Sequence, residues 1–404
     1  MKLTRRAKTI ITLLSFAAVA SAQFSVPQNA RMNSMANTFV IDDITDVYRY
    51  PVLMNDYYGH LQATFNTPIV GIKNINDMFS IGATATSGNM LRSFYGPART
   101  TLANLDGNLN ADIFQNQINI PHILLGFDLG TVQLGADVFF EYSRYSSKSE
   151  STPDGESTTE TTVSGALTNP GLVFSGKIDV GFPVMAKFGM GFPSIGGESK
   201  TGSTVNTEIK SEKGLYMEMG AEAKPSMMGL DWTAGFGYTS ESYQFQEDES
   251  IGVPYNNSVL DGYLGFEYDV LETAVSALQY HIMRTGNRSG EDDAYTLDEQ
   301  WSHQFSAAVE NTWVKPWKLD AFQLRAGMDY NINMDVTKAH TEAAGTTNES
   351  VTKNPANDNG FVPTMGFGFG KGFFQLDMNI GMGSWSNGLF SGPDVGSVTA
   401  TMKF

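Results

Sequence analysis

The feature of this sequence that most constrains its fold is a two-residue alternation of apolar and polar side chains, which begins at Tyr57 and recurs to the end. In residues 322–333, Phe, Leu, Ala, Met, Tyr and Ile alternate with Gln, Arg, Gly, Asp and Asn. Successive side chains of a strand point to opposite faces, so the pattern predicts strands with one apolar and one polar face. The polar face is too charged for the core of a sandwich, whereas a polar lumen accepts it.

Fifteen segments show this alternation: 57–66, 79–86, 123–129, 132–142, 171–182, 184–192, 213–223, 229–239, 259–271, 273–284, 302–314, 320–334, 360–370, 372–383 and 395–404. Bacterial barrels made of one chain have an even number of strands. One segment is therefore wrong or one strand is missing, and the stretches 68–78 and 87–119 are where a further strand could lie.

The connections between these segments alternate in length. The short ones are 130–131, 181–183, 224–229, 272–273, 315–319 and 370–372, and the long ones are 86–119, 144–169, 193–212, 240–257, 285–299, 335–359 and 384–394. Outer-membrane barrels alternate short periplasmic turns with long extracellular loops in this way, whereas a soluble all-β secreted domain gives no reason for it. Because residues 146–162 and 337–359 are rich in Ser, Thr, Glu and Asn, we expect them to be mobile loops.

The first 22 residues predict a secretory signal peptide. Four basic residues are followed by an apolar run from Ile10 to Ala20 and by the small-residue site Ala20-Ser21-Ala22, so we expect the mature chain to begin at Gln23. After Ala22 no apolar run approaches the roughly 18 residues of a transmembrane helix. A chain of this kind can span a membrane only as a closed barrel.

Composition excludes several kinds of chemistry. The chain has no cysteine, which rules out disulfides and thiolate sites, and its net charge of −17 argues against a nucleic-acid partner. The five histidines show no metal-ligand spacing, and no Gly-x-Ser-x-Gly elbow marks a nucleophile. Asp42, Asp43 and Asp46 lack the spacing of a calcium loop, and capping or pairing in the lumen is the favoured interpretation. We expect neither an enzyme, a cofactor nor a metal site.

The last strand, 395–404, has one apolar and one polar face and ends on Phe404. It resembles the closing strand of the outer-membrane β-barrels of Gram-negative bacteria, whose terminal aromatic residue is read by the insertion machinery. The resemblance implies that Phe404 is an insertion signal. It also implies a location in the outer membrane, with the lipid bilayer and the insertion machinery as partners.

Residues 33–54 resemble the N-terminal segment of the FadL-type and PorV-type barrel group. In that group Phe-Val leads to Asp-Asp, an aromatic residue and Asn-Pro-Ala; here Tyr50 stands in place of Asn and Val52 in place of Ala. The resemblance implies that residues 23–56 form a plug, or hatch, in the mouth of an up-and-down antiparallel barrel of about fourteen strands, residues 57–404. The candidate plug residues are Phe39, Asp42, Asp43, Tyr48, Tyr50 and Pro51.

The inward faces of the predicted strands carry mainly acids. The candidate lumen-facing charged residues are Asp137, Glu141, Glu218, Glu222, Glu267, Arg325, Asp329 and Asp377. Acids outnumber bases, so the lumen should disfavour anions; the alternative is cross-strand pairing that fills and stiffens the interior.

Two functions remain open. The first is passage of small compounds, hydrophobic ones among them, across the outer membrane, as FadL-type resemblance implies. The second is a scaffold barrel, as PorV-type resemblance implies, which anchors or shuttles proteins of a surface or secretion complex through its extracellular loops and conducts little. The polar inward faces are unlike a fatty-acid carrier, and no long connection is rich in aromatic residues. Transport is the preferred function.

Overall fold

The computed structural model describes residues 30–36, 38–64, 69–85, 116–118, 122–151, 159–247, 250–291, 294–316, 319–343, 346–355, 360–381, 385–386, 389–390 and 394–404. The predicted signal peptide and the start at Gln23 lie outside these residues. Among the described residues, no helix is long and apolar enough to cross a membrane.

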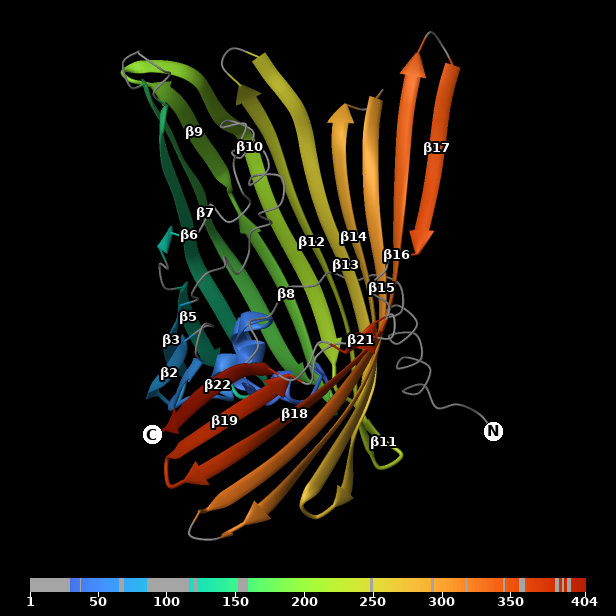
Figure 1. The fold of residues 1–404 in the computed structure, drawn as a ribbon. Coiled ribbons are helices and arrows are strands. Elements are labelled where there is room, and N and C mark those ends of the chain that lie inside the picture. Colours follow the sequence, from blue (N-terminus) through green and yellow to red (C-terminus); the bar gives the residue numbers. More distant parts are fainter. Residues whose placement is uncertain are drawn as a thin grey trace.

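The described strands form one antiparallel sheet that closes on itself, because the first strand pairs with the last over five residues. The barrel has sixteen strand positions (Figure 1). They are held by β1 (His60–Thr64), β2 (Ile69–Asn76), β3 (Phe79–Ala85), β5 (His122–Asp128), β6 (Val132–Ser151), β7 (Thr159–Asp179), β8 (Pro183–Gly191), β10 (Thr204–Ala223), β12 (Leu230–Glu247), β13 (Ser250–Leu271), β14 (Ala274–Glu291), β15 (Ala294–Val314), β16 (Ala321–Ala343), β18 (Gly360–Lys371), β19 (Phe374–Gly381) and β22 (Asp394–Lys403).

Six shorter strands extend or flank these positions. They are β4 (Asn116–Ile118), which pairs with β6; β9 (Ser194–Thr201), between β7 and β10; β11 (Ser226–Met227), beside β12; β17 (Thr346–Pro355), beside β16; and the pair β20 (Trp385–Ser386) and β21 (Leu389–Phe390).

The expected number of about fourteen strands is wrong, and β2 is the strand that the alternation missed. It lies in the stretch 68–78, and apolar side chains lie on both of its faces, with Ile69 and Ile75 exposed on the outside. Val70 and Ile72 point into the barrel and are buried against the N-terminal segment, whereas Lys73 is exposed. An inward face that packs against protein has no need to be polar, so β2 lacks the polar inner face by which the other strands were predicted.

Irregular loops were expected at 146–162 and 337–359, but the residues of these stretches that the structure describes form strands. The β6–β7 ladder continues without a break from Val132 and Ile178 to Ser151 and Thr159. The upper part of β16 pairs with β17 from Met334 to Ala343 in the same way. Hydroxyl-rich segments form these hairpins because ladder hydrogen bonds join main-chain groups, and Thr is a good strand former in water as well as in a core. The hairpins rise at one end of the barrel and the short turns lie at the other (Figure 1).

The expected two-faced strands are present. In β16, Leu324 and Met328 are exposed on the outside, whereas Arg325 and Asp329 point inward and are 0% and 6% exposed. The outer surface is thus apolar and the lumen wall polar and charged, as the sequence predicts.

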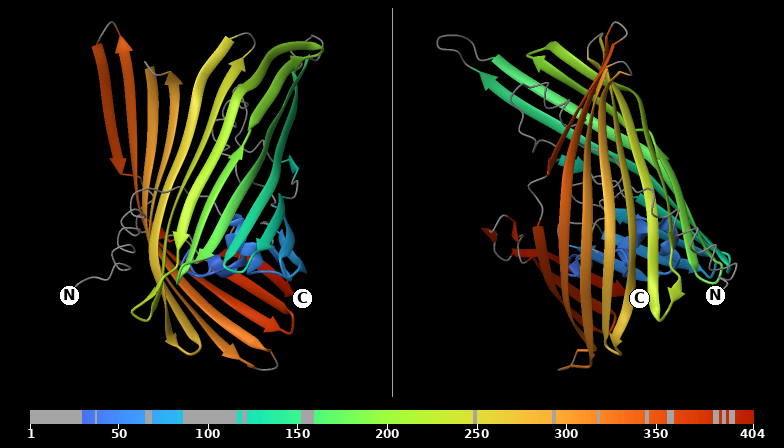
Figure 2. Two further views of the ribbon diagram at one scale, coloured as in Figure 1. Left: turned by 180° about the vertical axis from the view of Figure 1, so that it is seen from behind. Right: turned by 90° about the vertical axis from the view of Figure 1, so that its right-hand side faces the viewer.

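The N-terminal segment, residues 30–56, lies inside the barrel in the half nearer the short turns (Figures 1 and 2, blue). It contains α2 (Ala30–Asn33) and the 3-10 helices η1 (Ile44–Tyr48) and η2 (Pro51–Asn55). Asp43 caps η1, since its carboxylate accepts from Thr45 N at 3.0 Å and the carboxylate of Asp46 accepts from Asp43 N at 2.9 Å. Pro51 occupies the first turn of η2, where its missing N–H costs nothing.

Candidate functional site

The candidate site is the contact between the N-terminal segment and the lumen wall. One side chain cluster is apolar: Val47, Val52 and Met54 of the segment are fully buried against wall residues that include Leu124 and Met185. Three main-chain N–H groups of the segment donate to wall side chains: Val52 N to Ser175 Oγ at 2.7 Å, Phe39 N to Gln279 Oε1 at 2.6 Å and Ala30 N to Thr399 Oγ1 at 2.9 Å. The segment is therefore fitted to the wall by both packing and hydrogen bonds.

Glycines in the wall make room for this fit. A Cβ on Gly135 would lie 2.2 Å from Val52 N, and one on Gly366 would lie 2.3 Å from Ser34 Cβ. No side chain can be added at these positions unless the segment moves away.

Arg49 is the centre of the charged contacts. Its guanidinium donates to Glu222, to Tyr263 Oη at 2.7 Å and to Asp46 Oδ1 at 3.3 Å. The side chain also lies 4.8 Å from the centre of the Phe39 ring. Arg49 is only 6% exposed, so its charge is compensated by the wall and by the segment together.

A second charged cluster lies where α2 meets the wall. Arg31 Nη2 donates to Glu310 at 3.3 Å, and Arg325 Nε donates to the same carboxylate at 2.5 Å. Arg325 is fully buried and also donates from Nη1 to Asp377 at 2.6 Å. Ala30 N donates to Thr399 Oγ1 at 2.9 Å on β22, the closing strand.

The predicted plug residues all lie in this contact. Lys224, in the short connection after β10, binds Asp42. Tyr48 and Tyr50 are buried, and Lys187 Nζ lies 5.6 Å from the centre of the Tyr50 ring. Phe39 N donates to Gln279, Asp43 caps η1, and Pro51 lies in the first turn of η2. Their role as a plug of the barrel mouth remains a prediction.

The predicted lumen-facing acids are mostly partnered. His122 Nδ1 lies 3.1 Å from Asp137 and its Nε2 lies 3.7 Å from Glu141. Lys187 Nζ lies 3.5 Å from Glu218.

Two further predicted acids differ in their surroundings. Asp329 accepts from Ser306 Oγ at 2.5 Å, whereas Glu267 is half-buried. Among the described residues, no group of three or more His, Asp and Glu side chains is arranged to hold a metal ion.

Sequence reasoning included Arg325 but missed three other cations that compensate acids of the wall and the segment. Arg31, Arg49 and Lys224 are absent from the predicted site, because two lie on the segment and one in a short connection, outside the alternating strands. The available signal was the excess of inward-facing acids, since buried carboxylates require cations from elsewhere in the fold. These cations compensate part of the acidic charge of the lumen wall, and the prediction that the lumen disfavours anions stays a prediction. In the docked state Glu222, Glu310 and Asp377 are paired with cations.

The electrostatics of η1 depend on burial. Burial raises the pKa of Asp46 to about 7, against the opposing attraction of Arg49 and Lys224. Asp42 and Glu222 nearby act in the same direction as burial, because a second negative charge disfavours ionisation.

No family model matches the chain, and neither does any curated protein. Among solved structures, the chain is similar to the Ralstonia pickettii toluene transporter TbuX, with 12% identity and a TM-score of 0.41 over 94% of this chain and 99% of that chain. It is also similar to a chain of the FpvAI–pyocin S2 complex, with 11% identity and a TM-score of 0.34 over 86% and 67% of the two chains. A third similarity is to the Serratia marcescens hemophore receptor HasR, with 11% identity and a TM-score of 0.34 over 80% and 62%. At such identities these similarities concern the barrel fold alone.

Proposed function

We propose that the protein is an outer-membrane barrel for the passage of small compounds, and that residues 30–56 are a plug that must loosen before a compound can pass. The observation that carries this proposal is the docking of the segment by separable polar contacts, with Arg49 and Arg31 bound to wall carboxylates. The closed sheet with an apolar outer face supports the membrane location.

The lining of the lumen bears on the class of compound. Above the plug, the inward-facing residues of β15 and β16 include Ser302, Gln304, Asn331 and Asn333. Amide and hydroxyl groups favour solutes that form hydrogen bonds over fatty acids. We propose small polar compounds as the first class to test, and small hydrophobic compounds as the second.

The test is a reversible lock on the plug. The chain has no cysteine, so the double variant Val52→Cys/Ser175→Cys introduces the only pair that can form a disulfide. Val52 N and Ser175 Oγ are 2.7 Å apart, which brings the two positions together. Solute flux into proteoliposomes should be low for the oxidised variant and should return to the wild-type level on reduction. Each single variant serves as a control. Equal flux in the oxidised and reduced forms would show that the segment does not control passage.

The alternative is a scaffold barrel that holds protein partners at the cell surface. The observation that favours it is the extension of the β6–β7 and β16–β17 ladders into long hairpins beyond the plug (Figure 1). Shortening the β16–β17 hairpin at 340–349 should then release a co-purifying protein while solute flux stays unchanged. Flux that depends on the disulfide of the lock variant supports transport, whereas loss of a partner from the shortened variant with unchanged flux supports the scaffold.

A further inference from the structure

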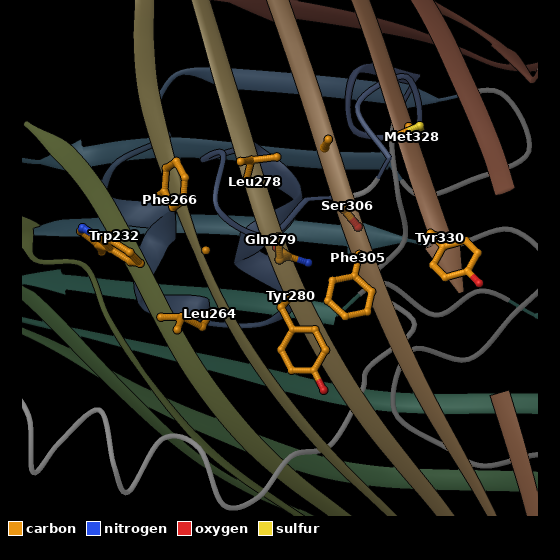
Figure 3. A pocket seen from close by; sticks show the side chains of 12 residues that line it. Trp232, Leu264, Phe266, Leu278, Gln279, Tyr280, Phe305, Ser306, Met328 and Tyr330 are labelled. Carbon is orange, nitrogen blue, oxygen red and sulfur yellow. The ribbon is translucent and has the colours of Figure 1, made fainter. Parts of the chain in front are cut away.

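An apolar groove crosses the outer face of the barrel on β12–β16 (Figure 3). Its volume is about 420 Å³, and its outward-facing lining includes Leu264, Leu278, Tyr280, Phe305, Met328 and Tyr330. The hollow has a simple cause. Ala307 stands between Leu278 and Met328 in the strand register, so one small side chain lies in a row of large ones.

Two cations lie beyond the hairpin end of this groove, on the same outer face. Arg284 Nε donates to Glu299 Oε1 at 2.9 Å, and Lys338 Nζ donates to Glu299 Oε2 at 2.6 Å. The shared carboxylate is 6% exposed, whereas the side chains of Arg284 and Lys338 are 25% and 43% exposed. The trio has a net charge of +1 in a chain whose net charge is −17.

Aromatic side chains join the groove to the cations. Tyr280 Oη lies 2.8 Å from His303 Nδ1 and the two rings are stacked, while Arg284 Cζ lies 5.9 Å from the centre of the Trp301 ring. Amphipathic rings of this kind are enriched at the boundary between hydrocarbon and headgroups. If the barrel spans a membrane, this enrichment favours a position of the cations at the height of the lipid headgroups.

The spacing agrees with this placement. Leu278 and Arg284 are six residues apart on β14, which is about 20 Å along a strand. Strand tilt in a barrel reduces this to roughly 15 Å along the membrane normal, and half of a hydrocarbon core is also about 15 Å. On β14 the groove lining ends at Tyr280, four residues short of Arg284, so a lipid whose headgroup lies at the cations extends its acyl chain along the strand and into the groove.

We propose that this face binds one lipid of the leaflet at the hairpin end, with an acyl chain in the groove and an anionic headgroup phosphate on Arg284 and Lys338. Glu299 holds the two cations side by side, and both have N–H donors in excess of the bonds that Glu299 accepts. A guanidinium matches the oxygens of a phosphate in a two-pronged geometry. The proposal requires that the barrel span a membrane, but it is independent of passage through the lumen.

The test measures lipids bound to the detergent-purified barrel by native mass spectrometry, with phosphatidylglycerol and phosphatidylcholine of identical acyl chains as probes. Wild type should retain one phosphatidylglycerol, with a preference over phosphatidylcholine of about tenfold or more. The variant Arg284→Gln/Glu299→Gln/Lys338→Gln removes both cations without stranding the carboxylate, and it should lose the preference. The variant Ala307→Trp fills the groove and should lose both lipids; Ala307→Leu is a milder version if assembly suffers.

The matched control is Lys148→Gln/Glu160→Gln/Lys210→Gln, which removes two cations and one carboxylate from exposed positions outside the groove. It should bind lipid as wild type does. Retention of the preference in the Arg284 triple variant would overturn the proposal. Equal binding of the two lipids by wild type would also overturn it. Displacement of lipid by inorganic phosphate, with phosphate binding unchanged in Ala307→Trp, would show an anion site without a lipid site. The transport proposal is tested by solute flux through the Val52→Cys/Ser175→Cys variant, so a negative result for lipid binding leaves that proposal intact.

Discussion

Arg49 illustrates how one buried charge joins two parts of this fold. It comes from the N-terminal segment, its main partner Glu222 comes from β10, and Tyr263 comes from β13. A buried ion pair of this kind is weak evidence for stability in itself, but breaking one leaves an uncompensated charge inside the protein. The residue is therefore expected to control how firmly the segment is held.

Replacement of Arg49 by Gln should weaken docking of the segment by about 3 kcal/mol, the lower end of the range for a broken buried pair, because Glu222 loses its guanidinium partner but keeps Lys224 Nζ at 3.4 Å. The measurement is the rate of protease cleavage within residues 30–56 of the folded barrel. The control is Lys177→Gln. The Lys177–Asp56 pair also joins wall and segment, at 2.7 Å, but both of its side chains are partly exposed. Loss of this pair should therefore weaken docking by only about 1 kcal/mol or less. Adding Glu222→Gln to Arg49→Gln should restore part of the protection. Similar cleavage rates for the two single variants would contradict this account.

Asp46 should make docking depend on pH. Its pKa is about 7 in the docked segment and 3.8 when unperturbed, so the docked state binds more protons between these values. The stabilisation of docking by protonated Asp46 is fully present below about pH 4 and is lost as the pH rises through 7.

Protease protection of wild type should accordingly fall between pH 4 and 7 more steeply than that of Asp46→Asn, which keeps an acceptor but cannot ionise. Arg49, Lys224, Asp42 and Glu222 surround Asp46 in both proteins, and the comparison therefore isolates the one carboxyl group. Parallel pH profiles of the two proteins would rule out Asp46 as the source of the pH dependence of docking.

At the level of elements, strand β6 has an apolar face on the outer surface and a second face that lines the lumen. Leu134 and Val138 are exposed on the outer surface, whereas Asp137 is buried in the lumen wall. Gly135 is on the inner face and Gly176, opposite Leu134 on β7, is on the outer face. The pair gives a direct test of the fit between segment and wall.

Gly135→Val should expel η2 from the wall, because a Cβ there would lie 2.2 Å from Val52 N. Protease cleavage of residues 30–56 should rise by about tenfold or more, since a docking loss of 1.4 kcal/mol already gives a factor of ten. Gly176→Val should leave the rate unchanged, as its Cβ would meet Leu134 Cδ2 at an ordinary 3.7 Å. Both variants should keep the heat-modifiable mobility of an intact barrel in gel electrophoresis. If Gly176→Val released the segment equally, steric fit at η2 would not be the cause.

For the whole molecule, sixteen strands enclose a lumen of the size class that is open in porins. The segment lies inside the half nearer the short turns (Figure 2), and its Arg31 and Arg49 pair with wall carboxylates. Removing the segment therefore changes both the bore and the charge of the lumen.

Deletion of residues 33–54 should raise single-channel conductance in planar bilayers and make the pore selective for cations, because Glu222 loses Arg49 as a partner. The reversal potential in a salt gradient measures this selectivity. A variant shortened at 340–349 serves as the control and should conduct as wild type does. An equally closed deletion variant would show that residues 30–56 do not block the lumen.

The sequence by itself determined the strand faces, the short turns and the barrel class, because a period of two is a local property that each strand repeats. It did not determine the strand number or the strand lengths. Val70 and Ile72 are apolar because the segment covers them, and Ser151 and Thr159 belong to a ladder because main-chain groups pair whatever their side chains are. The sequence also placed Glu222, Arg325 and Asp377 on the inner face. Only the tertiary structure brought Arg49 and Lys224 to Glu222 and Arg31 to Glu310, since such pairings join residues far apart in the chain and depend on how the segment lies inside the closed barrel.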